Sequence, residues 1–215
     1  MKSILFNSYD FNTFESRYKA LFFNSLSGIK NVCLIGTKDA KGLTNLAIFN
    51  SLIHVGSNPP LLGFIVRPDL VERHTLKNIL DTRHYTINFL TLGMEGKGHQ
   101  TSARYPKDTS EFHAVGFNEE YSNDFIAPYV GESIVKVGMV FKEKIDIKSN
   151  GTHLIVGEIN QLIMPENILK PDGFVDLAAV NTLASSGTDA YYTIEMLARY
   201  QYAKPNQESK TISND

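Results

Sequence analysis

Cysteine and tryptophan are almost missing from this sequence. Its 215 residues contain one cysteine, Cys33, and no tryptophan. A single cysteine excludes an intrachain disulfide and a zinc site built on several thiolates. Cys33 stands inside an apolar run, so we interpret it as a small core residue and not as a nucleophile.

The sequence also lacks a strong charge of either sign and a long hydrophobic run. The net charge of -2 argues against a general binder of nucleic acid or membrane surfaces. No apolar stretch approaches the roughly 20 residues that span a bilayer. The first twelve residues are too polar for a secretory signal. We therefore expect a cytoplasmic protein that binds neither nucleic acid nor membrane.

Motifs for metal and phosphate chemistry are missing as well. The six histidines follow no metal-ligand spacing, so we predict no metal site. The stretch GTKDAKGLT (36–44) has the wrong glycine and lysine spacing for a phosphate-binding loop, and no G-x-S-x-G nucleophile elbow occurs. Any chemistry must depend on another pattern.

Short apolar or alternating runs between turn residues predict a mainly β protein. Five runs read as strands: 31–37, 61–67, 84–90, 133–148 and 152–164. The last two flank Asn150 and Gly151, which favour a type I′ hairpin turn. Many strands with few helices indicate an antiparallel barrel. We predict one domain over 1–203 and a flexible polar tail over 204–215.

Helical patterns are short. Aromatic and apolar residues at helical spacing from Phe11 onward, closed by Gly28, predict an amphipathic first helix. Shorter helical patterns cover 75–80, 109–116 and 178–184. These few segments would lie at the periphery of the barrel.

A basic stretch precedes one of these helices. RPDLVERHTLKNIL (67–80) places Arg67, Arg73 and His74 before Thr75, a natural N-cap. The first turn of a helix has unpaired amides that attract an anion, and arginine matches the geometry of phosphate. The alternative is a capped surface helix with solvated arginines.

A second stretch carries small and amide side chains. Within 42–66, these residues precede a Pro-Pro break and a buried strand, and they could donate to a planar polar ligand. They are Thr44, Asn45, Ala47, Asn50 and Ser51. The alternative is a plain strand and loop.

Seven segments in a fixed order resemble the flavin reductase-like family. They are TKDAKGLTNLA, NPPLLGFIV, RHTLKNIL, YTINFL, SEFHAVGF, HLIVGEI and DGFVDL, and the resemblance extends from about Cys33 to Tyr192. It implies an FMN-binding, flavoredoxin-like split β-barrel: mainly β, antiparallel and of Greek-key type, with short peripheral helices. It also implies a homodimer with FMN at or near the interface.

The resemblance also implies a set of site residues. Those expected at the flavin ring and ribityl chain are Thr44, Asn45, Leu46, Ala47, Asn50 and Ser51, and those expected at the phosphate are Arg67, Arg73, His74 and Thr75. His99, Gln100 and Thr101 would border the flavin, and His153 would lie on the nicotinamide side. The chain departs from relatives at Ile48 and Asn50, where proline and serine are usual. It also lacks the arginine that often precedes the late glycine pair.

The function implied is that of an FMN oxidoreductase. NADH or NADPH would transfer hydride to flavin N5, and the electrons would pass to free flavin or to a partner monooxygenase. One alternative is a non-enzymatic flavin-binding electron carrier or storage protein. Another is a barrel that binds no flavin and serves as an interaction domain.

Overall fold

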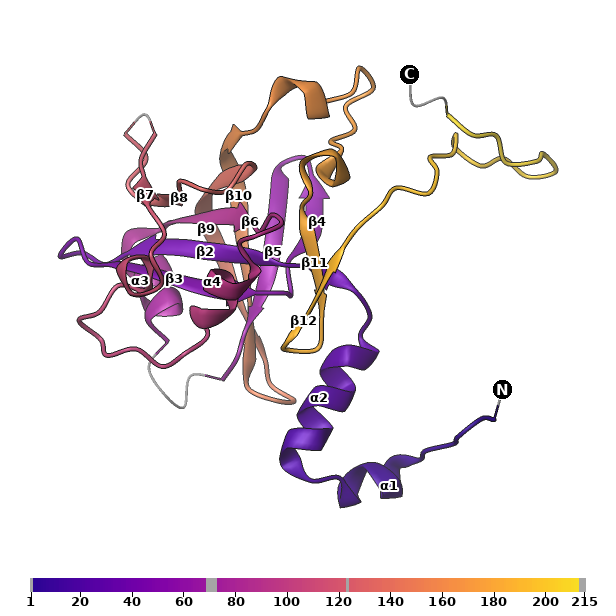
Figure 1. Ribbon diagram of the computed structural model, residues 1–215, viewed down its shortest axis with the longest axis horizontal. Helices are drawn as coiled ribbons and strands as arrows, with labels where there is room; N and C mark the ends of the chain where they lie inside the picture. The colour runs from indigo at the N-terminus through magenta and orange to yellow at the C-terminus, as the bar shows by residue number, and fades with distance from the viewer. Residues whose placement is uncertain (1, 69–72, 123, 213–215) are drawn as a thin grey trace.

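Seven antiparallel strands form the main sheet of the protein (Figure 1). This computed structural model describes residues 2–68, 73–122 and 124–212. The strand order is β3-β2-β6-β9-β10-β5-β4. The strands are β2 (Cys33–Lys38), β3 (Thr44–Phe49), β4 (Ile53–Ser57), β5 (Pro60–Val66), β6 (His84–Phe89), β9 (Lys136–Ile147) and β10 (Thr152–Ile163).

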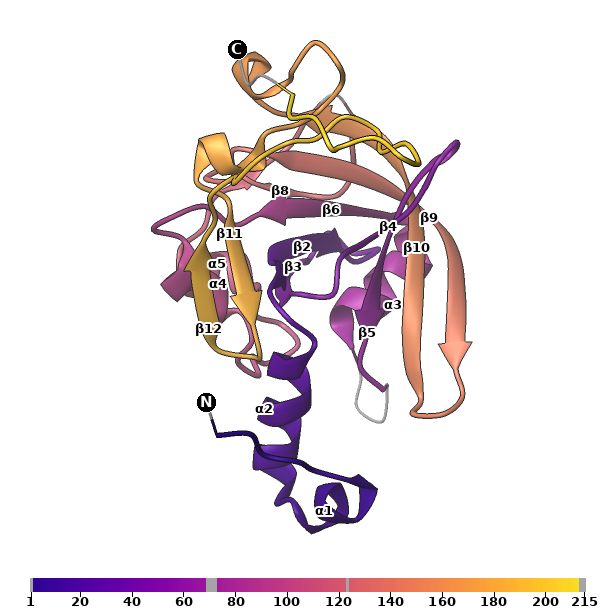
Figure 2. The same ribbon diagram turned by 90° about the vertical axis from the view of Figure 1, so that its right-hand side faces the viewer.

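Two smaller sheets lie beside the main one (Figure 2). The first joins β1 (Lys30–Asn31), β11 (Leu183–Ser186) and β12 (Ala190–Thr193). The second pairs β7 (Glu119–Glu120) with β8 (Tyr129–Val130). The prediction of a mainly β protein with few short helices is confirmed. Closure of the barrel and the Greek-key order stay predictions.

The helices are short and peripheral. They are α1 (Ser8–Thr13), α2 (Ser16–Leu26), α3 (His74–Thr82), α4 (Glu95–Gln100) and α5 (Glu111–Val115), with 3-10 turns η1 (Glu166–Ile168) and η2 (Leu177–Val180). None of the helices in the described ranges is long and apolar enough to cross a membrane.

Two of the helix predictions need correction. The first helix is broken, because Phe14 is extended (φ -65°, ψ 131°) and lets the aromatic rings of α1 fold back onto α2. The segment 178–184 is not a helix. Only η2 is helical there, because Asn181 takes a left-handed conformation and the chain then enters β11.

Side chains alternate along the strands and contribute to two larger cores, and Phe125, Ala127 and Tyr129 form a third, smaller cluster. Ile35, Ile87 and Met139 face one core, which α3 closes from outside with Leu76 and Ile79. The opposite face of β2 and β3 contributes to the outer core with the residues Val32, Leu34, Leu46, Leu90, Met94, Phe112, Phe117, Val130 and Leu183. Strand β3 therefore has packed neighbours on both faces.

The long hairpin forms as predicted, but its turn is different. Strands β9 and β10 pair antiparallel from Ile147 and Thr152. A type I′ turn needs positive φ at two consecutive central residues. Gly151 has φ 73°, whereas Asn150 is not among the residues with positive φ. The Asn150 side chain instead accepts from the Thr152 amide at 3.0 Å, so the prediction of a type I′ turn is wrong.

Candidate functional site

Strand β3 carries most of the residues predicted to contact flavin, and it lies at one edge of the main sheet. Alternation along the strand separates these residues onto two faces. Asn45 turns toward α3, where its side-chain amide donates to Thr75 Oγ1 at 2.9 Å, and Ala47 shares that parity. Leu46 turns the other way and packs in the outer core. Only part of the segment therefore faces α3.

The start of α3 differs from its prediction. The helix begins at His74, and Arg73 is the N-cap. Thr75 lies inside the first turn and is not the cap, because the chain leaves its extended conformation at Arg73 (φ -106°, ψ 98°). The buried Thr75 hydroxyl accepts the hydrogen bond from Asn45 instead. The first-turn amides still lie next to Arg73 and His74.

The two arginines of the basic stretch have different surroundings. Arg67 follows β5 and is exposed. Arg73 is partly buried, and its Nε donates to the Pro68 carbonyl at 3.3 Å. Residues 69–72 of the same predicted stretch lie outside the described residues. Arg73 is thus the arginine that the structure fixes at the start of α3.

A cavity of about 220 Å³ lies between α3, the β2–β3 turn and the loop at 107–109. One wall is the face of α3 with His74, Asn78 and Asp81, which recur at helical spacing. Thr44 and Asn45 of β3 also line it. The remaining lining residues are Asp39, Ala40, Lys41, Leu43, Lys77, Lys107 and Thr109. Three predicted site residues, from β3 and α3, thus border one cavity.

The charge around this cavity favours an anion. Two aspartates line it, and both carboxylates have partners. Asp39 accepts from the amides of Lys41 and Leu43, each at 2.8 Å, which closes the β2–β3 turn. Asp81 pairs with Lys77. Three lysines and two aspartates line the cavity, so the formal charge of these side chains is positive by one.

A buried carboxylate beside the outer edge of β3 was not predicted from the sequence. Glu111 begins α5, and its Oε2 accepts from the Leu46 amide at 2.9 Å. Burial raises the pKa of this carboxyl, while hydrogen bonds from the amides of Leu46 and of Glu111 itself lower it, as does the charge of His74. No local pattern in SEFHAVGF marks this role, because the partner lies 65 residues away.

The Thr44 hydroxyl is held in a network next to Glu111. It lies 2.6 Å from Ser110 Oγ and donates to Glu119 Oε1 at 2.6 Å. Glu119 also accepts from the Tyr121 hydroxyl at 3.0 Å, and its charge adds to burial in raising the pKa of Tyr121 to about 12. These bonds fix the end of β3 at the mouth of the cavity.

Asn50 and Ser51, the last two residues of the predicted flavin segment, hydrogen-bond to other parts of the chain. The Asn50 amide donates to the Gly187 carbonyl in the β11–β12 turn at 2.8 Å. Ser51 Oγ accepts from the Ile65 amide at 3.0 Å and donates to the Ile65 carbonyl at 3.3 Å. Ser51 therefore ties the chain to β5, whereas Asn50 reaches the β11–β12 hairpin.

The three candidate residues at the end of α4, of which Thr101 is the C-cap, have different surroundings. His99 is exposed and shares a hydrogen bond of 2.9 Å with the Tyr191 hydroxyl of β12. The Gln100 amide donates to the Tyr105 hydroxyl at 3.2 Å. Thr101 is buried, and its hydroxyl donates to Gly98 within the same helix. His99 and Asn50 thus both contact the β11–β12 hairpin.

His153 lies on β10, with its backbone opposite Val66, and does not line the cavity. Its imidazole is buried, and Nδ1 lies 2.7 Å from Asp146 Oδ1. Hydrogen bonds from Lys144 and His153 hold the pKa of Asp146 below its usual value. His153 and Ile155, two positions apart on β10, are both buried and so lie on the same face of the strand.

Comparison with known proteins decides the family. The Flavin reductase like domain family matches residues 28–181, well over half of the chain. This chain belongs to that family. The resemblance read from the sequence is therefore confirmed.

Solved structures of relatives agree with this membership of the flavin reductase like family. A candidate flavin reductase with a split barrel domain from Shewanella frigidimarina NCIMB 400 is 47% identical. It covers 94% of this chain and 100% of its own, with a TM-score of 0.90. Nitrilotriacetate monooxygenase component B from Bacillus cereus has 16% identity, coverage of 95% and 100%, and a TM-score of 0.79. An FMN-binding protein from Thermus thermophilus with bound 1-cyclohex-2-enone has 15% identity, coverage of 79% and 88%, and a TM-score of 0.66.

Membership in the flavin reductase like family indicates a flavin-related oxidoreductase with a split-barrel fold. The reductant, the electron acceptor and the residue roles depend on the site of this particular chain. Within the described ranges, no group of three or more histidine, cysteine, aspartate or glutamate side chains could hold a metal ion.

Proposed function

We propose that this protein binds FMN and uses NADH or NADPH to reduce it. The observation that carries the proposal is that Asn45 and His74 line one cavity while Asn45 bonds to the buried Thr75 behind it, in a chain of the flavin reductase like family. Asn45 and Thr75 are 30 residues apart in sequence. The sequence points to the Asn45 segment through its amide side chains and to the Thr75 segment through its arginines.

The phosphate of FMN is assigned to the start of α3. First-turn amides, the Arg73 guanidinium and the His74 imidazole match a dianion there. The buried hydrogen bond between Asn45 and Thr75 holds β3 against this turn. Arg67 is exposed nearby in sequence and adds charge to the same anion. The lysine-rich lining of the cavity favours the same ligand class.

The flavin ring is assigned to the strand beyond this cavity. The cavity of about 220 Å³ is below the range of roughly 300–1,000 Å³ that encloses drug-sized ligands, so it can hold only part of FMN. The residues Leu46 and Ala47 continue β3, and Asn50 and His99 lead on to the β11–β12 hairpin. Bound there, FMN would supply the redox chemistry by accepting hydride at N5. The protein supplies position and polar contacts.

The nicotinamide assignment of His153 remains a prediction. Its buried position and its bond to Asp146 suit a positioning role more than direct contact with a substrate. Gln100 and Thr101 keep their assignment at the flavin border. Both residues have protein partners, so they would act by shaping the loop around His99.

Two partners follow from the proposed chemistry. Nitrilotriacetate monooxygenase component B, which shares the fold, is named as one component of a monooxygenase. We assign this chain a similar place, as the source of reduced flavin for a partner monooxygenase or for the free flavin pool. A homodimer is part of the same proposal, because the cavity alone is too small for the whole cofactor.

Anaerobic reduction tests the proposed function. The protein reconstituted with FMN should lose its yellow colour when NADH or NADPH is added, and it should turn over when free FMN is supplied. Binding of FMN without reduction by either nicotinamide would favour an electron carrier or storage protein. Failure to bind FMN would leave an interaction domain. Flavin emission can be followed without tryptophan background, since the chain has none.

A further inference from the structure

The turn of the β9–β10 hairpin lies beside the chain that follows β5. Strand β10 pairs with β5 from His153 opposite Val66, so the turn and the end of β5 lie at the same end of the sheet (Figure 2). A Cβ at Gly151 in the turn would lie 3.7 Å from Cβ and Cγ of Pro68. The hairpin turn is therefore next to the proline ring, two residues after β5 ends.

Pro68 also contacts the arginine assigned to the phosphate. Its carbonyl accepts a hydrogen bond from Arg73 Nε at 3.3 Å. This bond does not use the two terminal nitrogens of the guanidinium, which form the fork that matches a phosphate. The position of the Pro68 carbonyl therefore sets the direction of the Arg73 side chain at the start of α3.

His153 and Asp146 form a cross-strand pair just behind the hairpin turn. They lie opposite each other on β10 and β9, and His153 Nδ1 lies 2.7 Å from Asp146 Oδ1. Lys144 pairs with the same carboxylate at 2.7 Å. The imidazole is buried, whereas Asp146 is exposed. Cross-strand pairs of this kind stabilise a sheet, so this one holds the hairpin in register beside Val66.

We propose that His153 is a positioning residue for the phosphate of FMN. Its bond to Asp146 holds the hairpin turn beside Pro68, and the Pro68 carbonyl orients Arg73. The imidazole acts through these contacts and does not line the cavity itself. This role differs from the contact with nicotinamide that the resemblance implies. The inference rests on the proposed function, because it concerns how FMN is held.

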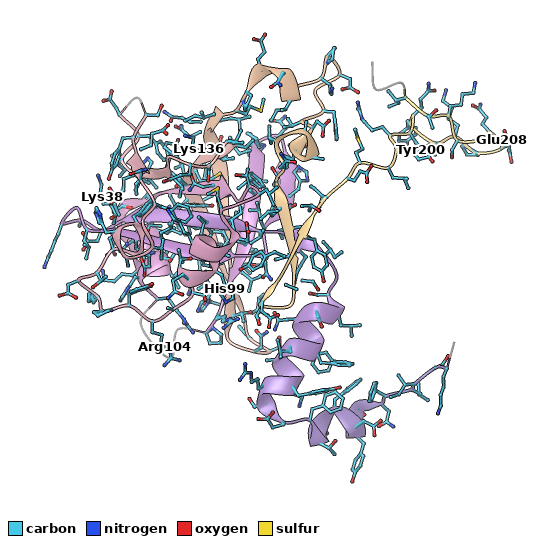
Figure 3. The ribbon with its side chains drawn as sticks, in the orientation of Figure 1. Lys38, His99, Arg104, Lys136, Tyr200 and Glu208 are labelled. Atoms are coloured by element: carbon cyan, nitrogen blue, oxygen red, sulfur yellow. The ribbon has the colours of Figure 1, made fainter. Side chains whose placement is uncertain are left out.

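The same hairpin offers a matched position for a control. Lys142 pairs with Glu158, which lies opposite Leu61 near the beginning of β5. Lys136 stands at the start of β9, at the end of the hairpin opposite the turn (Figure 3). Lys142 thus belongs to a charged pair of the same two strands, at the other end of β5 from Pro68.

Fluorescence titration of the full chain with FMN and with riboflavin tests the inference. We expect His153→Ala to weaken FMN binding about fivefold, a typical coupling between residues that act through one another, and to leave riboflavin binding unchanged. His153→Asn keeps an N–H that can donate to Asp146, so it should recover most of the loss. Lys142→Ala should bind both flavins as wild type does. Circular dichroism should give the same spectrum for all four proteins.

A double-mutant cycle separates this role from a general loss of structure. If His153 acts through Arg73, its loss should vanish when His153→Ala is made in an Arg73→Ala background. A histidine that only stabilises the fold would cause the same loss in both backgrounds and for both flavins. At saturating FMN, the KM for NADH or NADPH should be the same in His153→Ala and wild type.

Four results would overturn the inference. They are an unchanged FMN affinity in His153→Ala, an equal loss for riboflavin, a loss that persists without Arg73, and a raised KM for the nicotinamide with FMN affinity intact. The last would place His153 at the nicotinamide. In each case wild type still binds FMN, so the proposed function stands. If wild type bound no flavin, the proposed function would fail together with the inference.

Discussion

Arg73 is the residue on which the phosphate assignment depends most directly. Its guanidinium lies at the N-cap of α3, where Pro68 accepts from Nε. We expect Arg73→Ala to weaken FMN binding about tenfold or more, because a charge-assisted hydrogen bond contributes roughly 1.5–3 kcal/mol. Binding of riboflavin, which has no phosphate, should not change. Fluorescence titration with both flavins measures the difference.

The control for this prediction is Arg17→Ala, which removes the same charge from an exposed position in α2. It should leave both affinities unchanged. Arg73→Lys should recover only part of the loss, because lysine keeps the charge but not the planar fork. An equal loss for FMN and riboflavin would place Arg73 at the ring and not at the phosphate.

Ionisation of the Glu111 carboxyl should change the free energy of unfolding. Burial raises the pKa of its carboxyl above the ordinary value of 4.5. Because the pKa of this carboxyl is higher in the folded than in the unfolded state, ionisation costs more free energy in the folded state. Wild type therefore loses stability as the pH rises above the unfolded pKa. Glu111→Gln keeps an acceptor for the Leu46 amide and cannot ionise. We expect the variant to become more stable relative to wild type between about pH 4 and pH 7.

Urea unfolding at the two pH values measures this change in relative stability. Asp189→Asn removes an exposed carboxylate in the β11–β12 turn and serves as the control, which should lack the gain expected of Glu111→Gln. If Glu111→Gln and wild type kept the same difference at both pH values, burial would not govern the ionisation of this carboxyl.

At the scale of elements, neighbouring residues pack so closely against Gly36 of β2 that no methyl group fits there. A Cβ at Gly36 would collide with the Pro128 carbonyl and lie 2.6 Å from Thr86 Oγ1, and neither neighbour can move far because they bond to each other. We expect Gly36→Ala to lower the free energy of unfolding by about 1–3 kcal/mol. Chemical unfolding measures the loss.

The matched control is Gly96→Ala in α4. A Cβ at Gly96 would meet open space, and alanine favours the helix, so this change should be neutral or stabilise by up to about 1 kcal/mol. If both variants lost the same free energy of unfolding, the close contacts around Gly36 would not explain its loss.

At the scale of the whole molecule, helices α1 and α2 and the segment 194–212 project from the barrel (Figure 1). The barrel has complete cores on both faces of β2 and β3, whereas α1 and α2 have none. The barrel therefore supplies the candidate site.

Local patterns in the sequence predicted most of the barrel. Alternation and turn residues marked β5, β6, β9 and β10, and the apolar setting of Cys33 predicted its full burial. The predictions failed where backbone conformation depends on more distant packing. The turn at Asn150, the cap at Thr75 and the segment at 178–184 are examples, since several conformations suit the same short stretch.

The sequence by itself determined the strands, the basic start of α3 and the family, because side-chain alternation, helix periodicity and motif order are local properties. Only the tertiary structure decided which of these segments meet. Asn45 reaches Thr75, and Glu111 reaches the Leu46 amide, because α3 and α5 both pack against β3. Contacts between residues 30 and 65 positions apart depend on the packing of whole elements, which no short stretch of sequence encodes.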